Sequence, residues 1–188
     1  MMTIMRYPDT HKAEVRERIL RSAGAALRRA GIAGVSIPAL MKEAGLTHGG
    51  FYGHFQDRDA LVAEAIAKAG QETTEGAFGE GRTLAEALNR YLSLGHVTHP
   101  SEACVVAALG TEGTHQPPTV RAAFANVALG LIRNVERKLH PGRRTRVPSD
   151  EAMRLAATMV GAVVLARLVE DEALAERILR AARSSEAT

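Results

Sequence analysis

The sequence predicts an all-α fold. Apolar residues recur every three or four positions over most of its 188 residues, and no segment alternates apolar and polar residues over the length of a strand. Short segments containing glycine, proline or histidine separate these periodic stretches. We therefore expect helices joined by loops, and no sheet.

The composition is that of an ordinary globular protein, with 46% hydrophobic and 24% charged residues. The single cysteine, Cys104, excludes an intrachain disulfide and is typical of a reducing compartment. The longest apolar run, 155–166, is too short for a bilayer, which needs about 20 apolar residues. The first residues lack the apolar segment of a signal peptide. We expect a cytoplasmic protein without a membrane span.

The first two predicted helices have clear start and stop signals. Apolar residues from Val15 to Ala30 form one stripe of an amphipathic helix that stops near Gly31. A second helix begins at Ser36, whose side chain can cap it, and tolerates Pro38 in its first turn. Gly45 closes that helix.

A third, very short helix is predicted from Thr47, taken as its cap, to about Phe55. Asp57 caps a much longer fourth helix that runs to residue 78. The remaining helices are predicted at 84–95, 102–114, 118–140, 149–169 and 172–183. The segment 140–149, polar, basic and bracketed by prolines, is predicted to be an exposed loop.

Positive charge is concentrated at the start of the chain. Residues 1–58 hold nine Lys and Arg against five Asp and Glu, whereas residues 59–188 hold fifteen against sixteen. A basic module on a near-neutral body indicates a polyanion-binding head. An uneven solvated surface would give the same pattern, so charge alone leaves both interpretations open.

The segment "GLTHGGFYGHF" combines bulky rings with residues that weaken helices. A helical wheel puts Phe51 and Phe55 on one face, which we predict to be core. The opposite face holds only glycines: Gly49, Gly50 and Gly53. Two polar rings flank it: Tyr52 and His54.

A short helix, a turn and a second short helix form the outline of a helix-turn-helix, here at 36–44, 45–46 and 47–55. A helix of eight residues is about 12 Å long, close to the width of a DNA major groove. A face without side chains would let the backbone approach the groove, while Tyr52 and His54 would reach phosphates. A weak surface turn with ordinary core aromatics is the competing interpretation.

The segment "GLTHGGFYGHFQDRDALVAEA" closely resembles the helix-turn-helix and following helix of the tetracycline-repressor (TetR) family of bacterial transcription regulators. The resemblance is specific over about 13–67. It implies an all-α homodimer with a three-helix DNA-binding domain at 10–58 and a larger helical domain at 59–188. The larger domain would bind a small molecule and form the dimer through its last two helices. Effector binding would then change the spacing of the two heads and release a double-stranded operator.

The resemblance also implies DNA contacts, carried over by position. They are Ser36, Thr47, His48, Gly49, Gly50, Tyr52, His54 and Arg58. Many members of the family have a base-reading side chain at the place of Gly50, so base readout here would depend on fewer residues or on DNA shape. The helix at 149–169 is apolar almost all round, which independently favours a partner helix, although a central helix of a monomer would look the same.

Five residues after the head are candidates for an apolar effector pocket. They are Phe78, Tyr91, Cys104, Phe124 and Met159. Each such residue is more often part of an ordinary core. We expect an effector that is a small apolar or amphipathic molecule.

Other site chemistry finds little support in the sequence. His96, His99, His115 and Cys104 form no metal-binding pattern on a helix face, and no oxyanion loop accompanies a nucleophile. We therefore expect no metal, no cofactor and no catalysis. Three alternatives stay open: an activator of the same architecture, a helical protein-interaction module, and an enzyme that uses Cys104.

Overall fold

The computed structural model describes residues 9–184, and within this part all regular elements are helices. The elements are α1 (Asp9–Ala30), α2 (Ile37–Glu43), η1 (His48–Gly53), α3 (Arg58–Phe78), α4 (Leu84–Tyr91), α5 (Leu94–Thr98), η2 (Pro100–Glu102), α6 (Val105–Gly113), α7 (Pro118–Leu139), α8 (Asp150–Leu168) and α9 (Glu172–Ser184). The predicted all-α fold is confirmed.

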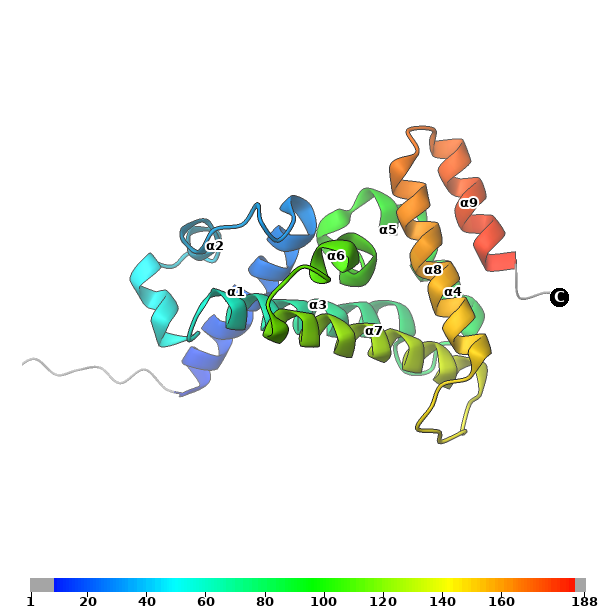
Figure 1. Ribbon diagram of the computed structural model, residues 1–188, viewed down its shortest axis with the longest axis horizontal. Helices are drawn as coiled ribbons and strands as arrows, with labels where there is room; N and C mark the ends of the chain where they lie inside the picture. Colours follow the sequence, from blue (N-terminus) through cyan, green and yellow to red (C-terminus); the bar gives the residue numbers. More distant parts are fainter. Residues whose placement is uncertain (1–8, 185–188) are drawn as a thin grey trace, which may run out of the picture.

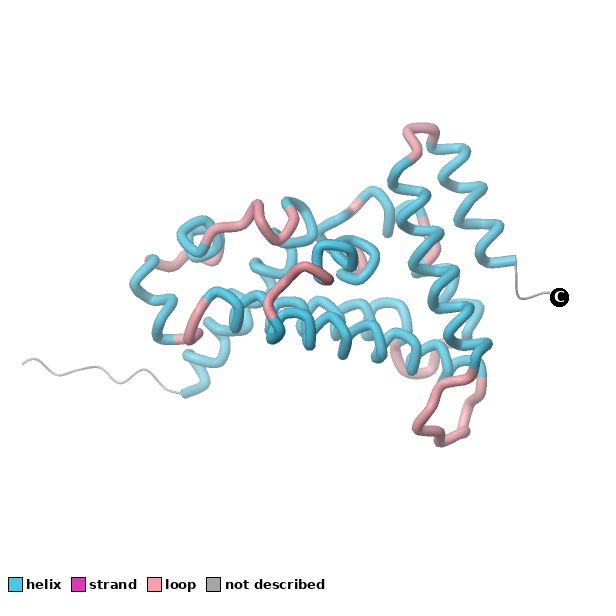
Figure 2. Tube along the Cα trace, in the orientation of Figure 1, coloured by secondary structure: helices cyan, strands magenta, loops and turns pink. Residues whose placement is uncertain are grey.

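The long helices α3 and α7 lie side by side along the molecule, with α1, α2 and η1 at one end and the α8–α9 pair at the other (Figure 1). Helices α3 and α7 approach closely at Gly70, where a Cβ atom would lie 2.6 Å from a methyl group of Val127. Loops occupy only the ends of the helices, and the exposed 140–149 connection is the largest of them (Figure 2).

Two of the helices expected after residue 78 differ from the structure. The segment 84–95 contains two helices, since α4 ends at Tyr91 and Ser93 caps α5 by accepting a hydrogen bond from the His96 N–H at 3.3 Å. A polar residue that can cap a helix, Ser93, thus divides a stretch whose apolar periodicity predicts one continuous helix. The helix expected from residue 102 begins at Val105, because residues 100–102 form η2 instead.

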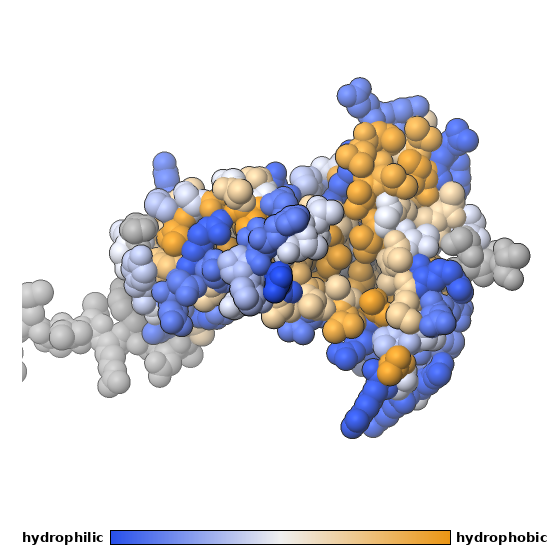
Figure 3. Space-filling view, in the orientation of Figure 1, coloured by the Kyte–Doolittle hydropathy of each residue, from blue (hydrophilic) through white to orange (hydrophobic). Residues whose placement is uncertain are grey.

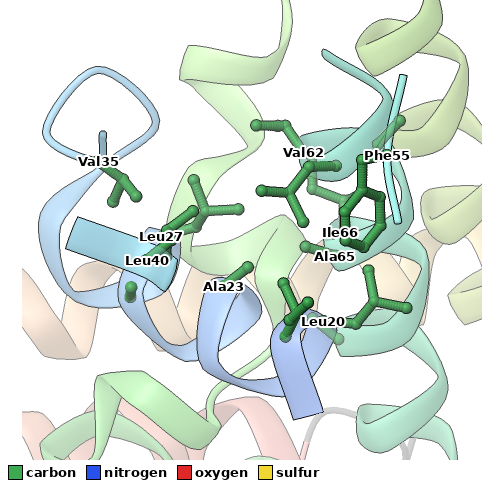
Figure 4. Close-up of a cluster of buried hydrophobic side chains, with 14 of the residues drawn as sticks. Leu20, Ala23, Leu27, Val35, Leu40, Phe55, Val62, Ala65 and Ile66 are labelled. Atoms are coloured by element: carbon green, nitrogen blue, oxygen red, sulfur yellow. The ribbon is translucent and has the colours of Figure 1, made fainter. Parts of the chain in front are cut away.

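The hydrophobic core consists of two clusters. The first core cluster joins α1, α2, η1 and most of α3, and Figure 4 shows side chains of α1, α2 and α3 meeting there. It also contains four residues from α6 and α7: Val105, Leu109, Val120 and Phe124. The second core cluster joins the end of α3 with α4, α8 and α9. Helix α3 therefore runs through both.

Candidate nucleic-acid interface and effector cavity

Helix α2 and the turn after it form as the sequence predicts. The Ser36 hydroxyl caps α2 by accepting a hydrogen bond from the Ala39 N–H at 3.4 Å, and Pro38 lies in the first turn. Gly45 has a φ of 74°, a conformation that side chains rarely adopt, and it turns the chain toward η1. This turn fixes the position of η1 relative to α2.

The element η1 is a six-residue 3₁₀ helix, where a short α-helix to Phe55 was expected. Thr47 occupies the cap position in an extended conformation, but its side chain makes no capping hydrogen bond, so the predicted side-chain cap is wrong. Three glycines in six residues give little α-helical propensity, and a 3₁₀ turn is a common form for so short a segment.

The aromatic residues of η1 separate into an inner and an outer set. Phe51 and Phe55 are buried, and their rings stack with centroids 5.8 Å apart, which confirms the predicted core role. The Tyr52 side chain is 68% exposed and meets the Phe51 ring edge-on at 5.1 Å. Tyr52 therefore stands on a surface that Phe51 supports from below.

The glycines of η1 face open space. A Cβ atom at Gly49 or Gly53 would meet no atom within 4 Å, and one at Gly50 would make ordinary contacts of 3.8 Å with Met41 and Thr47. None of the three has a positive φ. Neither backbone conformation nor crowding among the described residues requires glycine at these three positions.

His54 lies closer to the interior than the α-helical wheel implied. A 3₁₀ helix has about three residues per turn, so position 54 follows the buried position 51 on the inner side. The His54 ring is half-buried, and its Nδ1 has no hydrogen-bond partner. Burial, and then the positive charges of Lys12 and Arg16, lower the pKa of this imidazole. The side chain of His48, another predicted contact, lies outside the described residues.

The Arg58 side chain makes its hydrogen bonds within the predicted DNA-binding domain. Its guanidinium donates hydrogen bonds to the carbonyl oxygens of Ile32 and Val35, the second at 3.2 Å. The side chain is half-buried and holds the loop between α1 and α2. A nearby cation that is not among the predicted contacts is Lys42, which is exposed in the last turn of α2.

The five candidate pocket residues are all buried. Phe78, Tyr91, Cys104 and Met159 belong to the second core cluster, whereas Phe124 belongs to the first. Of the five, only Tyr91 lines a cavity described below. The structure thus places the other four in packed core.

A cavity of about 630 Å³ lies between α1, α3 and the segment from α4 to η2. Its charged lining residues are Arg21, Arg28, Arg29, Arg90, Glu72 and Glu102. The sequence does not reveal it, because Arg21, Arg28 and Arg29 resemble ordinary surface charges of one helix and Arg90 is distant from them in sequence. The available signal was Arg28, which falls between the apolar positions 27 and 30 of the first helix.

Arg28 is the buried charge of this cavity. Its side chain is 3% exposed, and it donates to the Ala103 carbonyl at 3.1 Å and to the Glu72 carboxylate at 3.0 Å. A second link joins the same end of α1 to α6, where the Glu112 carboxylate accepts the Ile32 N–H at 2.8 Å. These bonds connect the head directly to the larger domain.

His96 lines the cavity, and both of its ring nitrogens take part in hydrogen bonds. Nδ1 donates to the Tyr91 carbonyl, because a carbonyl only accepts, and Nε2 then accepts the Cys104 N–H at 2.7 Å. Burial lowers the pKa of His96, although the bond to Tyr91 acts in the opposite direction. Burial also raises the pKa of the Tyr91 hydroxyl, and the neighbouring Cys104 adds to this. His96 and Tyr91 are therefore neutral groups of the core near neutral pH.

Within residues 9–184, no three His, Cys, Asp or Glu side chains gather in a way that could hold a metal ion. In the same part of the chain, no helix combines the length and apolar character needed to cross a membrane.

The comparisons with known proteins agree with this architecture. Residues 19–65 match the profile described as bacterial regulatory proteins, tetR family. Comparison with curated protein sequences gives no match. Among solved structures, a TetR transcriptional regulator from Chloroflexus aurantiacus is similar, with a TM-score of 0.74, 23% identity, and coverage of 95% of this chain and 97% of that one.

Two further solved structures are also similar to this chain. NemR of E. coli in its reduced form has a TM-score of 0.71 and 22% identity, with 91% of this chain and 94% of that chain covered. AibR, in complex with isovaleryl coenzyme A and operator DNA, has a TM-score of 0.60 and 17% identity, with 90% and 96% covered. This chain therefore has the helix-turn-helix domain of the tetR family of bacterial regulatory proteins at residues 19–65, and as a whole it folds as the TetR transcriptional regulators do.

Proposed function

We propose that this chain is a cytoplasmic, homodimeric transcription repressor that binds a palindromic operator and leaves it when a small molecule binds. It acts by binding alone and catalyses no reaction. Residues 10–58 dock on DNA, and residues 59–188 form the dimer and hold the effector.

The outward surface of η1 is the observation that carries the DNA-binding proposal. Gly49 and Gly53 leave open space beside the exposed Tyr52, so the backbone of η1 can approach another surface closely. The dimensions of the major groove suit such a helix. Ser36, Thr47 and Gly50 border the same surface and are proposed contacts. The guanidinium of Arg58 helps by fixing the loop that carries Ser36.

The outward face of α8 supports the dimer. Met153, Leu165 and Leu168 are large apolar side chains exposed on this helix. Their positions, together with the partly buried residues at 160 and 164, recur at helical spacing along one face. Figure 3 shows the resulting hydrophobic patch over α8. Leu174 of α9 is also exposed, so a second copy of the α8–α9 pair would cover both helices.

Effector control is supported by the connection between head and body. A cavity that includes Arg28 and Glu72 adjoins the bonds that hold α1. A ligand that binds two head positions unequally can shift the population between them. The structure of AibR is a complex with both isovaleryl coenzyme A and operator DNA, which favours the same combination here. The apolar or amphipathic effector remains a prediction from sequence.

Selection of duplexes from a random pool tests the function. We expect enrichment of a palindrome that the full-length protein binds at least about a thousandfold more tightly than random duplex at one fixed salt concentration. The selected site should place two half-sites about 34–36 Å apart, or modestly more. Binding that depends only on salt, with no sequence preference, would favour the protein-interaction module instead.

A further inference from the structure

We propose that the cavity between α1, α3 and the α4–η2 segment is the effector site, and that its ligand is an organic anion with phosphate or several carboxylate groups. The regulatory part of this inference rests on the proposed function, whereas the binding part does not.

The charge of the residues that line the cavity is the basis for proposing an anionic ligand. Four arginines and two glutamates line the cavity, and with Arg29 paired to a carboxylate outside it, one positive charge remains in excess. Arg29 pairs with Glu43 at 3.0 Å, and Glu43 lies outside the cavity. Arg21 and Arg90 take part in no ion pair among the described residues. These two exposed guanidinium groups come from opposite walls, α1 and α4.

Arginine suits phosphate and carboxylate because its planar fork can donate two parallel hydrogen bonds to them. The buried Arg28 keeps an unused donor, since its Nε has no hydrogen-bond partner. An apolar or cationic ligand would leave this donor and the excess charge unsatisfied. The volume of about 630 Å³ is within the usual range for small-molecule sites, which is about 300–1,000 Å³.

The same cavity also shows how binding would reach the head. Arg28 belongs to α1, and its Nη2 donates to Glu72 of α3. An anion in contact with Arg28 competes with the Glu72 carboxylate for that guanidinium. It also draws Arg21 of α1 toward Arg90 of α4. Both effects change how α1 is held against the body, and α1 carries α2 and η1 through the first core cluster.

Nucleic-acid phosphate is the other source of this ligand chemistry. The position of the lining residues in the fold favours a small anion. Part of the lining comes from the segment α4 to η2, outside the helix-turn-helix: Arg90, Ser93, His99 and Glu102.

Calorimetry on the full-length protein without DNA tests the site. The probes are inorganic pyrophosphate, citrate and ADP, each titrated at constant ionic strength. We expect saturable binding of at least one probe, weakened about tenfold by Arg90→Gln and by Arg21→Gln, since each removes a charge-assisted hydrogen bond. Arg133→Gln is the matched control, because Arg133 is exposed on α7 outside the cavity. No saturable binding at millimolar concentration, or equal affinity in all three variants, would overturn the proposal.

Two further measurements test the regulation. Glu72→Gln should raise affinity for the anion severalfold, because it removes the internal competitor, and unchanged or lower affinity would refute the competition. The anion should weaken binding to the selected operator in the wild type but not in Arg90→Gln. Displacement of the bound anion by random duplex, dependent on Arg90, would assign the cavity to the nucleic-acid surface and overturn the effector role. Anion binding without any operator preference would refute the proposed function and leave the site intact.

Discussion

The outward faces of η1 and α8 are both exposed, but they differ in kind. On η1, two glycines leave the backbone uncovered beside one large ring, Tyr52. On α8, large apolar side chains stand out from the surface, including Leu165 at 55% exposed and Leu168 at 74%. The first face lacks the side-chain area that a protein interface requires, and the second lacks the polar groups that DNA requires. Each face thus excludes the role assigned to the other.

The largest effect should come from charging the α8 face. We expect Leu168→Glu to convert the dimer to a monomer, because two buried carboxylates would face each other across the interface. Loss of the second head should reduce operator affinity at least about a hundredfold. Sedimentation and operator titration measure both effects.

Val147→Glu is the matched control for this change. Val147 is 73% exposed, as Leu168 is, but it lies in the 140–149 loop away from α8. A Leu168→Glu protein that stays dimeric, or a monomer with full operator affinity, would remove the α8 face from the proposal.

A smaller effect is expected when side chains are added to the η1 face. Gly49→Ala should leave the melting temperature unchanged or raise stability by about 0.5–1 kcal/mol, because the site is open and glycine is flexible. Operator affinity should fall in the order Gly, Ala, Leu, and Gly49→Leu should lose about tenfold, or about 1.4 kcal/mol. Gly50 should be tested separately, since a methyl group can also contact a thymine methyl.

Gly130→Ala provides the control for these glycine variants. Gly130 lies in α7, and a Cβ atom there would also meet nothing within 4 Å. It should alter stability without altering operator affinity. If Gly49→Leu and Gly50→Leu both bind operator as tightly as the wild type, the η1 face does not dock.

Removal of polar groups at the edge of η1 should have a weaker and more uniform effect. We expect Tyr52→Phe and His54→Ala each to reduce affinity severalfold for all sequences and to flatten the salt dependence slightly, because they are assigned to phosphates. Titrations against several operator variants at a series of salt concentrations measure this. A changed base preference at one operator position would reassign the residue to base reading.

The smallest expected effect concerns His96 and the pH dependence of the unfolding free energy. The folded protein lowers the pKa of His96, so unfolding takes up a proton between the lowered value and the ordinary value of 6.5. The stability from His96 is complete above pH 6.5 and declines as the pH falls through that window. His96→Gln should reduce the pH dependence of the unfolding free energy there. His54, whose pKa is also lowered, contributes in the same window, so an unchanged slope in His96→Gln would assign the effect to His54.

The fold was largely predictable, because helix signals here are local. Caps at Ser36 and Asp57 and the turn at Gly45 are found where the sequence places them. The error at η1 has a different origin: a wheel drawn at the α-helical angle moved His54 outward. A 3₁₀ helix in so short a segment depends on packing against α2, which the sequence does not display.

The cavity was not predictable for a different reason. Its lining combines residues from α1, α3 and the α4–η2 segment, and only tertiary packing brings Arg21 and Arg90 to one space. The apolar residues predicted to line a pocket belong to the core instead, as Met159 and Phe124 show. Composition identifies which side chains avoid water, but it does not show which of them leave a space between them.

The sharing of the first core cluster also limits how far the DNA-binding head can be treated as a transplantable unit. Residues 1–70 would keep α1, α2, η1 and most of α3, but they would lose Val105, Leu109, Val120 and Phe124 from the same cluster. Such a fragment would expose apolar surface that α6 and α7 normally cover, and it should aggregate. A chimaera that gives this operator specificity to another effector domain would therefore need α6 and the first turns of α7 along with the head.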